Sequence, residues 1–167
     1  MDDAAPRTRP YRIAVLAQRY GRLGPMLEGA LERAGVNAEI SRYCGKECDI
    51  LAAFDTRLPV RRITPPDTCV PIIYSGSGRV RRALAGCPLP CVSCGTSAFD
   101  TVTVSSISRG RAMMTVQREL APLCGGIIEP CEMIVSYTGC DIYKALLCAA
   151  AVLMCAGAPG GDGIILP

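Results

Sequence analysis

The chain has 167 residues, half of them apolar, with a net charge of +3, eleven cysteines and no histidine. This length and apolar content fit one globular domain with a sizeable core. The lack of histidine excludes serine–histidine triads, histidine general bases and histidine metal sites. The small net charge and the aromatic content of 5% argue against a nucleic-acid-binding protein.

The N-terminus carries no apolar segment of the kind found in signal peptides. The longest apolar run, 145–156, is shorter than the roughly 20 residues that a membrane span needs. We therefore expect a cytoplasmic protein without membrane association, and cysteines that are free thiols, metal ligands or core residues. We expect a flexible tail over 1–10 and a single α/β domain over 11–167.

The first half of the chain alternates between strand and helix patterns. The continuous apolar run 12–17 predicts a strand buried on both faces. The spacing of Leu27, Ala30, Leu31 and Ala34 then predicts a helix that ends at Gly35. The elements expected next are a strand over 37–43, a short helix over 48–54, an extended piece over 59–64 and a strand over 69–74.

The second half continues this alternation. A short basic helix is expected after Gly78, and the later elements are strands over 90–94 and 102–107, a helix over 111–123, a strand over 132–137 and a strongly apolar helix over 141–155. Strands that alternate with helices predict a three-layer α/β fold with a mostly parallel sheet, of the flavodoxin-like or Rossmann-like kind.

In such a sheet, ligands bind outside the carboxyl ends of the strands. Four short loops are expected at that edge, each polar or cysteine-bearing and each before a possible helix. They are 18–22, 75–79, 94–97 and 138–141.

The loop Ser75-Gly76-Ser77-Gly78-Arg79 is the best candidate for anion binding. Its glycines let backbone amides face a ligand, and the following helix start adds positive potential. Arg79, Arg81 or Arg82 could hold a phosphate oxygen, and Thr96 and Ser97 are further candidate ligand contacts. The loop lacks the third glycine of the dinucleotide-binding motif, and a glycine turn with solvated arginines is the alternative.

Cys87, Cys91 and Cys94 have a spacing suited to an iron–sulfur cluster or another metal. A cluster would need a fourth ligand, for which Cys124, Cys131, Cys140 and an exogenous ligand are the candidates. The alternative is that these thiols are core residues, as free cysteines often are. An iron–sulfur cluster is the one cofactor that the sequence points to.

Cys140 is a candidate nucleophile because it lies between a predicted strand and a helix start, where the helix dipole favours a thiolate. Asp141 beside it opposes this effect. Cys94 is a second candidate, since it ends a predicted strand at the same edge. The alternative for Cys140 is a small residue in a tight turn.

Several segments resemble the aminoimidazole ribonucleotide carboxylase/mutase family of purine synthesis. They are 13–17, the glycine loop 72–78, 89–95 with Phe99-Asp100, and the alanine-rich helix 145–154. The resemblance implies that family's fold and a phosphate-binding edge. It does not extend to the carboxylase activity, because the family's essential histidines have no counterpart here.

Three functions are therefore open. The first is binding of a phosphate-bearing or nucleotide-like small molecule at the sheet edge. The second is an iron–sulfur or metal-binding accessory role, and the third is a structural subunit with core cysteines. The apolar excess also predicts self-association into a homo-oligomer.

Overall fold

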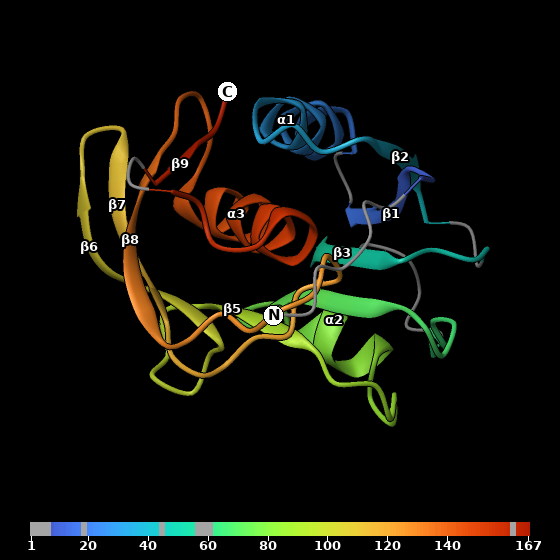
Figure 1. The fold of residues 1–167 in the computed structure, drawn as a ribbon. Helices are drawn as coiled ribbons and strands as arrows, with labels where there is room; N and C mark the ends of the chain where they lie inside the picture. Colours follow the sequence, from blue (N-terminus) through green and yellow to red (C-terminus); the bar gives the residue numbers. More distant parts are fainter. Residues whose placement is uncertain (1–7, 18–19, 44–45, 56–61, 161–162) are drawn as a thin grey trace.

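A single curved sheet surrounds one central helix in the computed structural model (Figure 1). The structure describes residues 8–17, 20–43, 46–55, 62–160 and 163–167. Within these ranges nine strands join in the order β2-β1-β3-β4-β5-β6-β7-β8-β9. The strands are β1 (Tyr11–Ala17), β2 (Ala38–Arg42), β3 (Ile50–Asp55), β4 (Val70–Tyr74), β5 (Val92–Gly95), β6 (Val102–Ser108), β7 (Arg111–Val116), β8 (Cys131–Ser136) and β9 (Ile164–Ile165). The helices are α1 (Tyr20–Arg33), α2 (Gly78–Ala83) and α3 (Ile142–Ala156).

The half of the sheet from β2 to β6 is parallel. Ile13 of β1 pairs with Ile50 of β3, and Ile50 pairs with Val70 of β4. Apolar side chains alternate between the two faces of these strands, and both faces are covered. That two-sided burial explains why β1 and β3 read as continuous apolar runs.

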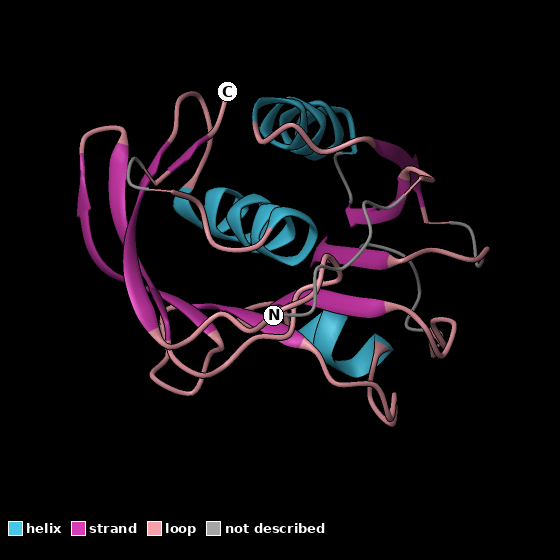
Figure 2. Cartoon of the chain, viewed as in Figure 1, coloured by secondary structure: helices cyan, strands magenta, loops and turns pink. Residues whose placement is uncertain are grey.

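The larger core lies between the sheet and the helices α1 and α3, which pack against each other on one face. The opposite face holds a smaller core beneath α2, which contains Leu16, Leu51, Ile73 and Val80. Figure 2 shows α2 as a short helix below the strands, on the side of the sheet away from the two long helices.

Helix α3 has strong helix formers along its length and is buried from Ala145 to Cys155. Asp141 caps its start, with the side chain accepting a hydrogen bond from the Lys144 backbone N–H. Gly157, with a φ of 80°, ends the helix. The predicted apolar helix over 141–155 is confirmed.

The predicted mostly parallel three-layer fold is wrong. Strands β6, β7 and β8 pair antiparallel, so the sheet is mixed. The described residues contain three helices against nine strands, and both long helices lie on the same face. The protein is therefore richer in sheet than a flavodoxin-like or Rossmann-like fold.

Two helix predictions fail for identifiable reasons. Residues 111–116 form β7, whose exposed and buried side chains alternate with a period of two. Gly110, with a φ of 72°, closes a tight hairpin in which Ser108 faces Arg111. Residues 48–54 largely become β3, because a short apolar run has no periodicity that separates a helix from a buried strand.

The predicted tail lies mostly outside the described residues, since the structure describes the chain from residue 8 onward. Arg9 contacts the body of the protein through an ion pair with Asp49, at 3.3 Å. Among the described residues, no helix combines the length and apolarity needed to cross a bilayer.

Candidate functional site

The glycine loop after β4 forms one wall of a groove of about 510 Å³. The groove lies at the carboxyl ends of β3 and β4, where a parallel sheet places its ligands. Ser77 accepts a hydrogen bond from the Val80 backbone N–H at 3.3 Å and donates one to Asp55 at 3.4 Å. The groove is lined by Phe54, Asp55, Tyr74, Gly76, Ser77, Gly78 and Arg79.

The rings of Phe54 and Tyr74 form the apolar side of this site, and Tyr143 packs against Tyr74. Tyr74 stacks on Phe54 with ring centroids 5.2 Å apart, and Tyr143 of α3 lies 4.8 Å from Tyr74. A Cβ atom at position 76 would lie 2.4 Å from the Tyr74 ring, so a larger residue there would displace this ring. Burial, followed by the nearby Tyr143, Asp141 and Asp100, raises the pKa of Tyr74, so its hydroxyl stays protonated at neutral pH.

A second groove, of about 590 Å³, lies beside the N-terminus of α3 and is also lined by residues of α1. Lys144 lines it and also reaches over the Phe54 ring, 5.0 Å from the centroid, so it connects the two grooves. Asp141 forms an ion pair with Lys144. The lining consists of Arg22, Pro25, Met26, Thr138, Gly139, Cys140, Asp141, Lys144 and Pro167.

The loop after β5 is held by a buried carboxylate. Asp100 is 3% exposed and accepts a hydrogen bond from the Ser97 backbone N–H at 3.0 Å. Its Oδ2 atom and the Ser75 Oγ atom each lie 2.3 Å from where a Cβ atom of Gly95 would stand. Gly95 thus provides the space in which the loops after β4 and β5 meet.

Some of the predicted anion-site residues line the groove, and others do not. Gly76, Ser77, Gly78 and Arg79 line the groove, whereas the Ser75 hydroxyl points toward Gly95 and Asp100. Thr96 and Ser97 are exposed but do not line either groove. Of the three arginines, only Arg79 is among the described residues that line the groove; Arg81 and Arg82 are not part of its lining.

The predicted metal site at Cys87, Cys91 and Cys94 is wrong. Cys94 lies in the core under α3, with its thiol 4.0 Å from the Leu146 carbonyl, whereas Cys91 precedes β5 and is exposed. Cys94 is therefore buried, Cys87 half-buried and Cys91 at the surface. No group of three or more cysteines and carboxylates among the described residues is placed to hold a metal ion.

The two candidate nucleophiles differ in their surroundings. Cys94 is 1% exposed, and burial, with Asp100 nearby, strongly raises the pKa of its thiol. Cys140 is half-buried in the second groove, where burial and Asp141 raise its pKa while Lys144 opposes them. Neither environment favours the thiolate that a nucleophile requires.

Sequence reasoning missed Phe54, Asp55, Tyr74, Tyr143 and Lys144. The sequence pattern of 48–54 predicts a helix, so it places no strand end at Phe54 and Asp55. A signal existed in the polar Asp55 directly after the apolar run. Tyr143 and Lys144 belong to the predicted helix, but its contact with the β3 and β4 ends is tertiary.

No family model and no curated protein matches this chain. The resemblance to the carboxylase/mutase family therefore stays a prediction.

Proposed function

We propose that the protein binds a phosphate-bearing or nucleotide-like small molecule in the groove between the β3 and β4 ends. The observation that carries the proposal is the combination of chemistries around this one groove. Tyr74 and Phe54 provide an apolar wall, Asp55 a carboxylate and Arg79 a cation. The aromatic wall suits a base ring or the carbon face of a sugar, the carboxylate suits sugar hydroxyls, and the guanidinium suits a phosphate.

The proposal does not depend on the positive electrostatic potential at the N-terminus of α2. The helix has six residues, and the Ser77 hydroxyl already satisfies one of its first amides. Arg79 carries the anion recognition instead, because a guanidinium can donate two parallel hydrogen bonds to a phosphate. The stacked rings add rigidity, which lowers the entropic cost of holding a ligand in one pose.

Isothermal titration calorimetry with adenosine monophosphate, ribose 5-phosphate and inorganic phosphate tests the proposal. We expect binding of at least one phosphate ester and an affinity loss of about tenfold in Arg79→Ala, typical of one charged hydrogen bond. Arg82→Ala is the matched control, since Arg82 lies on the same helix outside the groove.

The control variant should bind as the wild type does. Absence of binding for all three probes, or equal affinities for Arg79→Ala and Arg82→Ala, would contradict the proposal. Binding of adenosine, titrated as a further probe, as tightly as its monophosphate would place recognition on the nucleoside alone and contradict the phosphate assignment.

A further inference from the structure

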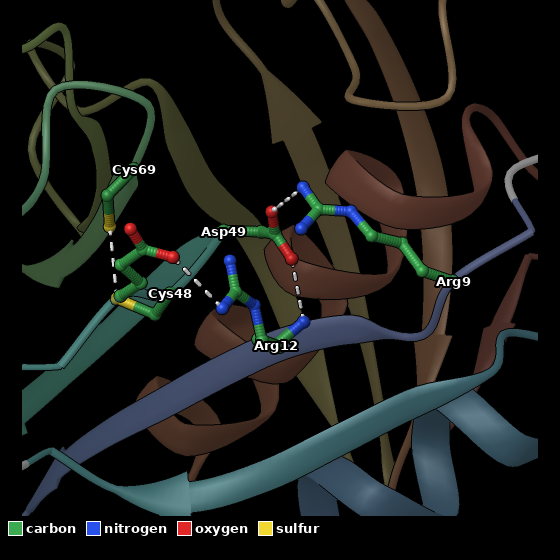
Figure 3. A network of polar contacts seen from close by, with 6 residues as sticks. Arg9, Arg12, Cys48, Asp49 and Cys69 are labelled. Carbon is green, nitrogen blue, oxygen red and sulfur yellow. Dashed lines mark hydrogen bonds and ion pairs between the residues drawn. The ribbon is translucent and has the colours of Figure 1, made fainter.

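Two cysteines outside this groove lie against each other. Cys48, just before β3, and Cys69, just before β4, have sulfur atoms 3.5 Å apart and joined by a hydrogen bond (Figure 3). Both residues are 3% exposed and belong to the smaller core. They are 21 positions apart in the chain, so the fold alone brings them together.

The backbone holds this pair in place. The residues that directly follow the two cysteines are joined, since the Val70 N–H donates to the Asp49 carbonyl at 2.9 Å. The Asp49 side chain accepts from the Arg12 backbone N–H at 2.8 Å and from Arg9 at 3.3 Å. Figure 3 shows the two contacts of the Asp49 side chain beside the two sulfurs. The cysteine that precedes Asp49 is therefore anchored to β1 and β4 at once.

We propose that Cys48 and Cys69 are a reversible redox pair that closes to a disulfide when a peroxide oxidises the protein. A disulfide has an S–S distance of about 2.05 Å, so each sulfur has to move by less than about 1 Å. Side-chain rotation at two neighbouring strand starts can supply such a shift without breaking the β3–β4 ladder.

The chemistry has a direction. Either thiol can donate the hydrogen bond between the two sulfurs. When Cys69 donates, the bond lowers the pKa of Cys48 and raises that of Cys69. Burial and Asp49 act against the Cys48 thiolate, and Arg12 favours it. The Cys48 thiolate attacks one peroxide oxygen, the O–O bond breaks, and a sulfenic acid forms with release of water after proton uptake. The Cys69 sulfur then attacks the Cys48 sulfur, the S–O bond breaks and a second water leaves. Two electrons pass from the sulfurs to the peroxide.

The tryptic map of this chain isolates the pair. Peptides 47–57 and 63–79 each contain one cysteine, Cys48 and Cys69 respectively. Native protein is treated with hydrogen peroxide, blocked with an alkylating agent, digested without reductant and examined by mass spectrometry. We expect these two peptides to appear linked, about 2 Da lighter than their sum, and to separate after dithiothreitol.

The same experiment on Cys69→Ala and Cys48→Ala should leave no such linked peptide, whereas Cys155→Ala, at another buried thiol, should form it as wild type does. The wild-type map stands even if a variant fails to fold. Alkylated Cys48 and Cys69 after oxidation, or linkage of either to another cysteine in place of its partner, would overturn the assignment.

Discussion

Gly95→Ala tests the physical account of how the site is held. The added Cβ would overlap the Asp100 Oδ2 and Ser75 Oγ atoms, each 2.3 Å away. Pushing the carboxylate aside breaks its 3.0 Å hydrogen bond from the Ser97 N–H, which is worth about 1.5–3 kcal/mol. The displaced Asp100 side chain leaves its preferred rotamer, which destabilises the fold further, by about 0.5–1.5 kcal/mol. Replacing a glycine in a strand by alanine stabilises the fold by about 0.5–1 kcal/mol, which offsets part of this loss.

The middle of these ranges gives a loss of about 2.5 kcal/mol in the free energy of unfolding. Urea unfolding followed by circular dichroism measures it as a lower midpoint at unchanged slope. Gly160→Ala is the control, because a Cβ there meets nothing within 4 Å, and it should stay within about 0.5 kcal/mol of wild type. A Gly95→Ala loss no larger than that of the control would refute the reasoning.

Two further predictions concern α3 and the buried thiols. Asp141→Ala removes the N-cap of α3 and should lower the free energy of unfolding, measured in urea, by about 1 kcal/mol. Asp141→Asn should keep most of this stability, because asparagine also caps helices. Equal losses in the two variants would exclude capping as the cause. Burial raises the pKa of Cys94 and Cys148, so above about pH 8.5 the unfolded state releases protons that the folded state keeps. Stability should therefore fall as pH rises from about 8.5, by up to about 1.4 kcal/mol per pH unit for each thiol, and Cys148→Ala should show the shallower decline; an identical pH profile would contradict the assignment.

Local sequence patterns were sufficient for the elements whose pattern is long or strongly apolar. Strand β1, strand β4 and helix α3 were predicted because their apolar runs are set by burial in one core. The glycine loop after β4 was likewise recognisable, and four of its five residues line the groove. Phosphate binding there remains a prediction for calorimetry to test.

Local patterns could not specify pairing between distant segments. Residues 111–116 have three apolar side chains in a row, Ala112 to Met114, and become a strand because β6 and β8 pair with them on either side. The spacing of Cys87, Cys91 and Cys94 pointed to one shared centre, and the alternation of side chains along β5 sends Cys94 into the core.

The Cys48–Cys69 contact is a pairing that the sequence pattern did not predict. Nothing in the spacing of these cysteines marks them as partners, since 21 positions separate them. They meet because β3 and β4 pair in one parallel register, with Ile50 opposite Val70. Composition and periodicity report whether a residue is buried, whereas strand order and register set which buried residues touch, because pairing energies depend on segments far apart in the chain.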